Sequence, residues 1–207
     1  MDATRRTELQ TAFLNSVVHV VSELGIGRAT TRAIAEHARL NEAYIYRCFS
    51  NKEDMLRAAF HQEDLRFVQL VLDHLPVMGC ITLSIRVRCF QLWRSVWAFV
   101  LEKPEDCKFY LRYYFSQNYL LHARTEHLQC FQPLLDAMTP LFLPGKNVSI
   151  LLHQAFETML SFAVKVMDGE LPNDLTTAVT VFEQVYGCVS PHLRDAGINA
   201  KKRSAAT

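Results

Sequence analysis

Long apolar runs are missing from this 207-residue sequence, although half of its residues are hydrophobic. No run approaches the ~20 residues of a membrane helix, and the richest one, QLWRSVWAFVL, is interrupted by Arg94. The N-terminal MDATRRTELQ has no apolar signal region either. These absences predict a chain without membrane contact or export signal, whose hydrophobic fraction suffices for a substantial core.

Paired cysteines are also missing. The six cysteines are scattered without a CxxC pair, at Cys48, Cys80, Cys89, Cys107, Cys130 and Cys188. Several fall in apolar helical patterns, where a reduced cysteine packs as a small hydrophobe. The distribution predicts a reducing, cytoplasmic setting with neither a disulfide framework nor a zinc site. A redox-sensing thiol is the alternative role.

The motifs of common enzyme classes are absent too. The sequence has no glycine-rich phosphate loop, no HExxH and no nucleophile elbow. The adjacent Glu105 and Asp106 fit the first turn of a helix, where the macrodipole favours acidic side chains. We therefore predict no enzymatic activity, no metal site and no cofactor.

A strong positive charge is the last absence. The net charge is +1, and residues 1–57 hold eight Lys or Arg against seven Asp or Glu. Because phosphate neutralisation supplies most non-specific affinity for nucleic acids, this balance counts mildly against nucleic-acid binding. A few well-placed cations would have to provide it.

What the sequence does contain is helical spacing, with little of the alternation typical of strands. Phe13, Val17, Val20 and Leu24 form one apolar stripe at i, i+4, i+7 and i+11. The predicted class is all-α, with a three-helix helix-turn-helix domain before a larger helical domain and about nine helices in all. The expected helices span residues 4–24, 31–38, 42–49, 50–74, 80–102, 104–118, 121–139, 147–168 and 174–189. The expected domains are residues 1–57 and 58–190, followed by a loose tail at 191–207.

Short signals mark several helix ends. Thr30 or Thr31 suits the N-cap of the second helix. Ser50 and Glu53 predict a capping box at the start of the fourth. Pro133 is expected to kink the 121–139 helix or to end it early.

The second and third helices, joined by a three-residue turn and preceded by a longer helix, predict a helix-turn-helix unit. In such a unit the second helix of the pair lies in the major groove of DNA, while neighbouring elements hold the phosphates. Small and apolar residues are spaced to pack between the helices, namely Phe13, Val17, Ile34, Ala35, Ala38, Leu40, Ile45 and Phe49.

This packing leaves a polar edge on the N-terminal side of the third helix. Asn41 can cap that helix or bond a base edge, and Tyr44 can contact thymine methyls or phosphate. Tyr46 and Lys52 suit phosphates, where the next helix N-terminus adds its positive dipole. The predicted DNA-binding residues are Thr30, Thr31, Asn41, Glu42, Ala43, Tyr44, Tyr46, Arg47 and Lys52. The alternative is a plain helical bundle, with both tyrosines packed against a partner and Lys52 a solvated charge.

Three consecutive segments, TTRAIAEHA, RLNEAYIYRCF and SNKEDML, resemble the TetR family of bacterial regulators. They match that family's second helix, recognition helix and fourth-helix start, and the Tyr-x-x-Phe and Lys-Glu spacing continues past the bare helix-turn-helix. Beyond about the first 60 residues the chain resembles the family only in helix count and length. The resemblance implies an all-helical homodimer with a variable ligand pocket in its larger domain, located with the DNA in the bacterial cytoplasm.

Three residues depart from that family's pattern. Arg39 stands where the family usually has glycine, and an αL arginine costs ~1–2 kcal/mol, so a distorted turn is expected. Glu42 stands where many members have Lys or Arg; its carboxylate is unfavourable near phosphates but can accept from cytosine N4. Tyr44 stands where Thr or Ser is commoner. These departures concern the operator sequence and not the fold.

Aromatic residues are concentrated between residues 86 and 122. Phe90, Trp93 and Trp97 share one face of the 80–102 helix, and the adjoining face is also apolar, so this helix is central to its domain. Buried tryptophans and tyrosines need hydrogen-bond partners, and both a ligand cavity and a filled core fit the pattern. The candidate ligand-binding residues are Phe90, Trp93, Trp97, Arg112, Tyr113, Gln117 and His122. Arg86 and Arg112 can bind an acidic ligand group, although solvated arginines are commoner.

The last two long helices carry more apolar surface than one packing face requires. Exposed together, such faces promote aggregation, so we expect a four-helix interface between two copies of the chain. The predicted interface residues are Leu152, Phe156, Met159, Ala163, Val179, Phe182 and Tyr186. His153 and Glu157 can bond along or across this interface, but a metal role has no third ligand in view.

These features together predict a sequence-specific DNA-binding transcriptional regulator, a repressor released from a palindromic operator by a small apolar or aromatic ligand. Its expected partners are double-stranded operator DNA, a second copy of the chain and an unknown small-molecule effector. The alternative is a DNA-binding protein that needs no ligand or is controlled by a partner. A filled core in the larger domain would favour that alternative.

Overall fold

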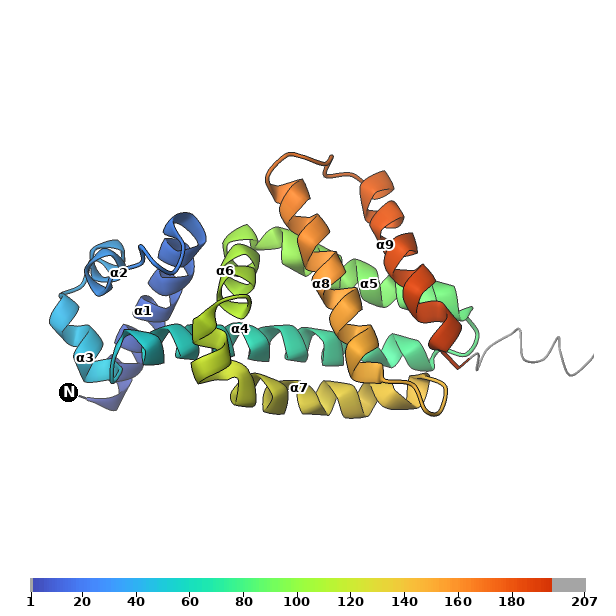
Figure 1. Cartoon of the computed structure of the whole chain (residues 1–207), viewed down its shortest axis with the longest axis horizontal. Helices are drawn as coiled ribbons and strands as arrows, with labels where there is room; N and C mark the ends of the chain where they lie inside the picture. The colour runs from blue at the N-terminus through green and yellow to red at the C-terminus, as the bar shows by residue number, and fades with distance from the viewer. Residues whose placement is uncertain (1, 195–207) are drawn as a thin grey trace, which may run out of the picture. The chain divides into compact units, whose positions relative to one another are not determined.

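The computed structural model describes residues 2–194, and all regular secondary structure in that range is helical (Figure 1). The range holds nine α-helices, which confirms the all-α prediction. They are α1 (Ala3–Leu24), α2 (Thr31–Ala38), α3 (Ile45–Cys48), α4 (Lys52–His74), α5 (Ile85–Glu102), α6 (Pro104–Tyr114), α7 (Arg124–Met138), α8 (Val148–Met167) and α9 (Leu175–Val189). Short helical turns are the 3₁₀ segments η1 (Glu42–Tyr44), η2 (Leu75–Gly79), η4 (Thr139–Leu141) and η5 (Ser190–His192), and the π-helical η3 (Tyr119–Ala123).

The chain forms two compact units. The first contains the residues up to Arg66 together with Lys103–Cys130, and the second contains Phe67–Glu102 and the residues from Phe131 onward. Their borders fall inside α4 and α7, so each of these helices contributes to both units. The domain borders expected at 57/58 and 190/191 stay a prediction.

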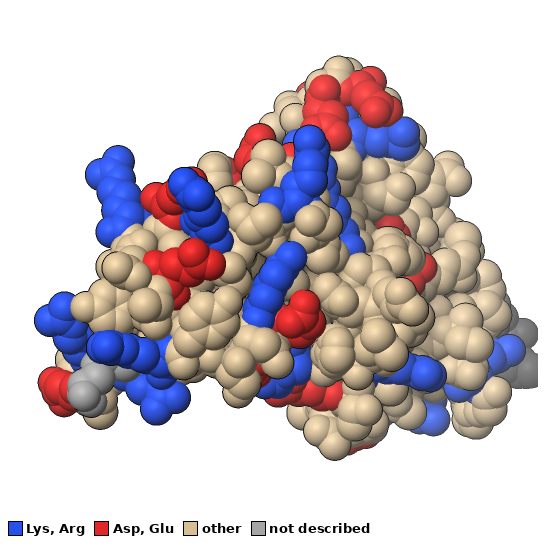
Figure 2. All heavy atoms as spheres, turned by 60° about the vertical axis from the view of Figure 1, so that its left-hand side comes forward, with Lys and Arg blue, Asp and Glu red and all other residues tan. Residues whose placement is uncertain are grey.

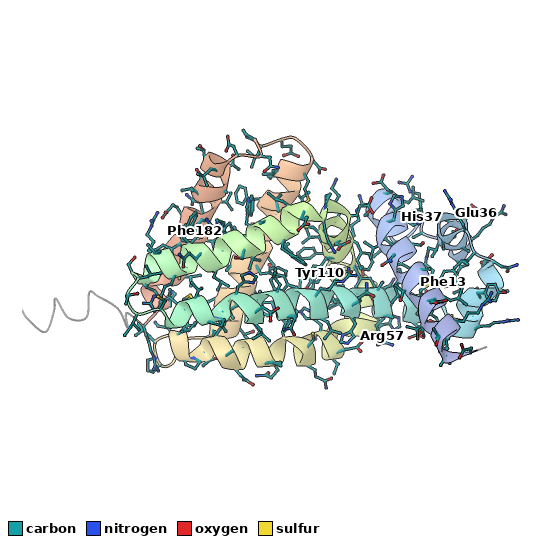
Figure 3. The ribbon with its side chains drawn as sticks, turned by 180° about the vertical axis from the view of Figure 1, so that it is seen from behind. Phe13, Glu36, His37, Arg57, Tyr110 and Phe182 are labelled. Atoms are coloured by element: carbon teal, nitrogen blue, oxygen red, sulfur yellow. The ribbon has the colours of Figure 1, made fainter. Side chains whose placement is uncertain are left out.

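The core of the helix-turn-helix lies where α1, α2 and α3 meet. Phe13 and Val17 of α1, Ile34 of α2 and Ile45 of α3 are completely buried (Phe13 is labelled in Figure 3). Full burial of each such side chain contributes roughly 1.5–3 kcal/mol. The apolar spacing of the sequence predicted the packing of these four residues correctly, whereas Leu24, from the same predicted stripe of α1, is 41% exposed.

A second part of the first unit is a buried aromatic cluster around Phe60 of α4. The ring of Phe60 stacks on those of Tyr110 and Tyr113, with centroids 4.8 and 4.7 Å away (Tyr110 is labelled in Figure 3). Beside it, the His127 ring nitrogen Nδ1 lies 3.0 Å from the carboxylate of Asp64, and both residues are buried. Burial raises the pKa of the Asp64 carboxyl, and the hydrogen bond from His127 opposes that shift.

The core of the second unit is formed by α5, α8, α9 and the end of α4. Trp93 and Trp97 of α5 stack with centroids 5.5 Å apart, and Phe90 meets Phe182 of α9 edge-on at 5.1 Å (Phe182 is labelled in Figure 3). Helices α8 and α9 also pack against one another (Figure 1). The broad apolar arc of α5 thus covers neighbouring helices of its own unit.

The cap of α4 is displaced by one residue from the predicted capping box. The Asn51 side chain accepts from the backbone N–H of Asp54 at 2.8 Å, and the Asp54 carboxylate accepts from the N–H of Ser50 at 3.0 Å. Asn51 and Asp54 thus provide the cap in place of Ser50 and Glu53, but Asp54 reaches back to the N–H of Ser50 and not to that of Asn51. Asparagine and serine are equally good N-caps, so the sequence alone does not choose between them.

Two predicted helix ends also differ. Helix α5 begins at Ile85 and not at 80, because residues after η2 form turns in which Leu83 N–H bonds Cys80 C=O. Helix α6 ends at Tyr114. Helix α7 continues through Pro133 to Met138, so this proline does not end it.

Helix α8 is the one helix of the described range that is long and apolar enough to cross a membrane, with a mean hydropathy of 1.2. The prediction that no segment approaches that length was therefore wrong. Met159, Leu160 and Ala163 of α8 are buried in the second unit, while Glu157 and Lys165 lie on the same helix. Core packing of these residues accounts for part of its apolar character, since 22% of the apolar stretch is buried.

The described part of the predicted C-terminal tail is attached to the segment after α7. Arg194 donates from Nε to the Phe142 carbonyl at 2.7 Å, and His192 C=O accepts from Leu143 N–H at 2.8 Å. The rest of that tail, residues 195–207, lies outside the described residues.

Candidate nucleic-acid interface

The turn between α2 and the recognition segment is regular. Arg39 adopts the left-handed conformation with φ 54° and ψ 39°. Its N–H bonds Glu36 C=O at 3.1 Å, and Leu40 N–H bonds Ala35 C=O at 3.0 Å, which is the Schellman pattern. The prediction of a distorted turn was wrong, because Arg39 adopts the αL conformation that glycine would adopt freely.

The recognition segment begins with a capped 3₁₀ turn. The Asn41 side chain accepts from Ala43 N–H at 2.9 Å, and Tyr44 N–H bonds Asn41 C=O at 3.0 Å. Helix α3 follows directly, and burial of Ile45 and Cys48 fixes its rotation. Of the two roles predicted for Asn41, the structure contains the cap.

The opposite edge of this segment faces solvent. Tyr46 is 59% exposed, and Asn41, Ala43 and Arg47 are exposed as well. The Arg47 guanidinium lies over the ring of Tyr44, 5.2 Å from its centroid, which orders the arginine. An accessible polar edge of this kind is the arrangement that groove binding needs.

Thr31 and Glu42 are joined directly. The Thr31 hydroxyl donates to Glu42 Oε1 at 2.5 Å, and both residues are half-buried. Thr31 is free for this bond because Thr30 caps α2, accepting from Ala33 N–H at 3.1 Å. The starts of α2 and of the recognition segment are thereby linked through a side-chain hydrogen bond.

Lys52 holds the loop that precedes α2. Its ammonium donates to the Ile26 carbonyl at 3.3 Å, and the residue is half-buried. An ammonium has three donors, so two remain for a phosphate. The predicted phosphate contact is thus compatible with this structural bond.

Two histidines attach α2 to its neighbours, a contact that the sequence reasoning missed. The rings of His19 and His37 stack with centroids 4.1 Å apart (His37 is labelled in Figure 3). His37 Nδ1 lies 3.0 Å from the Ser16 hydroxyl, and His19 Nδ1 lies 3.0 Å from the Glu105 carboxylate. Burial, with a smaller contribution from His19, lowers the pKa of His37.

Positive and negative side chains are interspersed on the face shown in Figure 2. The exposed arginines of the first 50 residues are Arg5, Arg6, Arg28, Arg32, Arg39 and Arg47. Arg32 is paired with Glu36 on α2 at 2.8 Å. This agrees with the balanced charge of residues 1–57, so the described residues offer individual cations and not a broad basic surface.

The predicted ligand-binding residues are divided between the two units. Phe90, Trp93 and Trp97 lie in the second unit, and Arg112, Tyr113, Gln117 and His122 lie in the first. Arg112 donates to the Val21 carbonyl at 2.8 Å and so holds the end of α1. Tyr113 is completely buried in the Phe60 cluster, whereas Gln117 and His122 are exposed.

A buried arginine of α5 escaped the sequence reasoning. Arg88 is only 2% exposed; its Nη1 donates to the Met78 carbonyl at 2.7 Å, and its Nε and Nη2 have no partner among the described residues. The indole N–H of Trp93 is likewise buried without a partner. Arg86, the arginine singled out from the sequence, instead pairs with Glu183. No sequence signal separates buried Arg88 from its exposed neighbours.

Several residues predicted for a dimer interface are used by the core of a single chain. Met159, Ala163 and Phe182 are at most 3% exposed, because α8 and α9 direct these side chains inward, and they are not accessible to a partner. Leu152, Phe156, Val179 and Tyr186 are half-buried. The outer surface of α8 carries a shallow hollow of about 310 Å³, lined by Ile150, His153, Gln154, Glu157 and Thr158.

Comparison with known proteins agrees with this geometry. Residues 15–59 match the family model of bacterial regulatory proteins of the tetR family. A TetR family transcription regulator from Marinobacter aquaeolei VT8 has a TM-score of 0.74 at 19% identity, covering 90% of this chain and 98% of that one. A putative tetR family regulator from Shewanella sp. PV-4 has a TM-score of 0.71 at 14% identity, covering 86% and 96%. FadR from Bacillus subtilis, solved in complex with stearoyl-CoA, has a TM-score of 0.65 at 17% identity, covering 84% and 96%. A search of curated proteins finds no sequence match. The chain therefore carries a tetR-type segment within the fold of TetR-family regulators.

Proposed function

We propose, with this tetR-type segment as the premise, that the protein is a sequence-specific DNA-binding transcriptional regulator. The observation that carries the proposal is the solvent-exposed polar edge of η1 and α3 on a buried helix-turn-helix core. In such units the first residues of the recognition helix contact base edges, and flanking groups hold phosphates. The protein acts in the bacterial cytoplasm, associated with the nucleoid.

The contacts divide into two kinds. Tyr46 and Arg47 project from the exposed edge, and Lys52 retains free donors, so these three suit phosphates. Glu42, Ala43 and Tyr44 begin the segment and suit base edges. Thr30, Thr31 and Asn41 position that segment through the caps and the bond to Glu42.

Selection of bound fragments from random duplex DNA tests this proposal. The purified full chain should enrich a two-fold symmetric consensus. Arg47→Gln should then weaken binding several-fold and reduce the salt slope of log K by about 1, since one phosphate contact is lost. The control Arg94→Gln on α5 removes another exposed cation, which belongs to the other unit. It should leave the affinity and the salt slope unchanged. Failure to enrich any sequence would contradict DNA-binding regulation.

The proposed regulator is a homodimer, in which two copies meet through the outer surface of α8. Ile150 is 62% exposed beside the hollow there, and an apolar side chain in such a place suits a self-complementary contact. Ile150→Glu should shift the sedimenting species from dimer to monomer. Ile81 is 64% exposed elsewhere in the second unit. The control variant Ile81→Glu should therefore remain a dimer. A monomeric wild type would refute this arrangement.

The proposed effector is a small molecule with an apolar body and an anionic group, which releases the protein as a repressor. Arg88 and Trp93 support it, because buried donors without partners are uncommon and suit a polar ligand group. FadR of Bacillus subtilis was solved with stearoyl-CoA. Stearoyl-CoA and palmitate should weaken the binding of the wild type to its operator, and they should weaken the binding of Arg88→Met less. The control is Arg86→Met, which removes an exposed arginine and should respond to both compounds like the wild type.

A ligand-independent regulator is the second candidate. The stacked Trp93 and Trp97 and the Phe90–Phe182 contact fill the space where a ligand was expected, which favours it. Operator affinity unaltered by the anionic amphiphiles would support this second candidate over the first.

A further inference from the structure

We propose that Glu42, oriented by Thr31, selects cytosine at one position of each operator half-site. The inference rests on the proposed function, and it assigns base specificity to one carboxylate and a positioning role to one hydroxyl. The central observation is the hydrogen bond from Thr31 Oγ1 to Glu42 Oε1 at 2.5 Å.

Both partners of this bond lie on fixed backbone. Thr31 is the first residue of α2, whose start is capped by Thr30. Glu42 is the first residue of η1, whose start is capped by Asn41. Because neither residue is needed for its own cap, the hydrogen bond can restrict the Glu42 side chain without disturbing the helix starts. A restricted carboxylate discriminates between bases better than a mobile one, since less rotamer freedom is lost on binding.

The carboxylate of Glu42 has no ion-pair partner within the described part of the chain. The nearby Arg32 is paired with Glu36, at 2.8 Å from Nε to Oε1. Thr31 engages only Oε1, so Oε2 keeps its capacity to accept. Arg32, whose pKa is raised chiefly by Glu36 and less by the charge of Glu42, compensates the Glu42 carboxylate only weakly. A negative charge on a DNA-facing edge opposes binding unless a base donates to it.

Cytosine is the base that fits such an acceptor. Its major-groove edge presents the N4 amino donor, whereas guanine presents the acceptors N7 and O6, and thymine presents O4 and a methyl group. Adenine offers an N6 donor, but its adjacent N7 acceptor repels a carboxylate. Preference for cytosine of about tenfold to a hundredfold over the other bases is the expected scale.

A purely structural role predicts a different outcome. If the Thr31–Glu42 bond only joined α2 to η1, its loss would lower stability and affinity for all sequences alike. A specificity role changes the preferred base at one position, which a general loss of structure does not do.

The test is selection from random duplex DNA with matched variants of the full chain. In Glu42→Gln the amide can pair with adenine N6 and N7, so the preference at one position per half-site should move from cytosine toward adenine. Glu36→Gln is the control, since it removes one exposed carboxylate of α2 (labelled in Figure 3) outside the pair. Because Glu36 is already paired with Arg32, its loss should change the overall affinity less than the loss of Glu42 does, and it should leave the consensus unchanged.

Thr31 is tested by a conservative pair. Thr31→Ser keeps the hydroxyl and should retain the cytosine preference, whereas Thr31→Val removes it and should reduce the preference several-fold at the same position. Thermal unfolding of each variant identifies those that fold. If Thr31→Val fails to fold, the Glu42→Gln consensus decides alone.

The outcomes separate this inference from its premise. If the wild type enriches no sequence, the proposed function itself is refuted. If it enriches a consensus that Glu42→Gln leaves identical at every position, DNA binding stands and the role of Glu42 is overturned. If Glu42→Gln changes the preferred base at one position and Glu36→Gln leaves the consensus unchanged, the inference is supported.

Discussion

Apolar spacing predicts the buried residues of the helix-turn-helix correctly but misplaces several residues of the α8–α9 pair. In both regions the spacing was used to assign buried and exposed helix faces. In the helix-turn-helix, Ile34 and Ile45 are buried and Tyr46 is exposed, as the spacing predicts. In α8 and α9, Met159 and Phe182 were assigned to an outer interface, yet they lie in the core.

The width of the apolar stripe explains the difference. Helices α2 and α3 are short and carry narrow stripes, so only one rotation buries their apolar residues. Helices α8 and α9 are apolar over a wide arc, and several rotations bury similar area. The choice among these rotations is made by shape complementarity with α5, such as the edge-on contact of Phe90 with Phe182, which a single sequence does not encode locally.

The largest expected effect sharpens this comparison at α9. Phe182→Ala should reduce the free energy of unfolding by about 3–5 kcal/mol, because it leaves a cavity in the core of the second unit. Ile150→Ala, at an exposed position of the paired helix, should change the stability of the single chain by less than about 0.5 kcal/mol. Denaturant unfolding at two protein concentrations measures both.

The concentration dependence distinguishes core from interface. A core role for Phe182 predicts the same loss at both concentrations. If instead the loss disappeared on dilution to the monomer, Phe182 would act between subunits and the comparison would fail.

Most of the fold and the accessible part of the site could be predicted from sequence. Glycine, proline and cap residues placed the helices, and the exposed Tyr46 and Arg47 agree with the predicted edge. The Thr31–Glu42 bond and the buried Arg88 could not be predicted, because each depends on side-chain positions that are set by tertiary packing.

The next effect concerns the cap of α4, where neighbouring residues competed for one role. Asn51→Ala should destabilise the protein by about 1 kcal/mol, because the Asp54 N–H loses its acceptor. Ser50→Ala should have less than about half that effect, since the main bond of Ser50 to Asp54 comes from its backbone N–H, which the variant keeps. Chemical denaturation of both variants checks this. The reverse order would restore the capping box predicted from the sequence.

A smaller effect, of opposite sign, is expected at Arg39. Arg39→Gly should stabilise the fold by up to about 1 kcal/mol, since glycine adopts φ 54° without a clash but has a more flexible unfolded chain. Arg39→Ala removes the same charge and keeps the strain, so it should not stabilise. Thermal unfolding separates the two, and an equal gain in both variants would assign the effect to charge.

The smallest effect is a pH dependence at the same cap. The backbone N–H of Ser50, with Arg57 adding a hydrogen bond (Figure 3), lowers the pKa of the Asp54 carboxyl. The ionised form is therefore favoured by folding, so its contribution is present above the unfolded pKa near ~4 and is lost as the pH falls through the folded pKa. The stability advantage of the wild type over Asp54→Asn should shrink as the pH is lowered from about 5 to 3, measured by urea unfolding.

Burial raises the pKa of Glu63, so Glu63→Gln must show the opposite slope, with the wild type gaining stability relative to the variant over the acidic range. If the stability difference from the wild type changed with pH in the same direction for both variants, these two carboxylates would not set the pH dependence individually. The acid unfolding of the whole chain would then account for it.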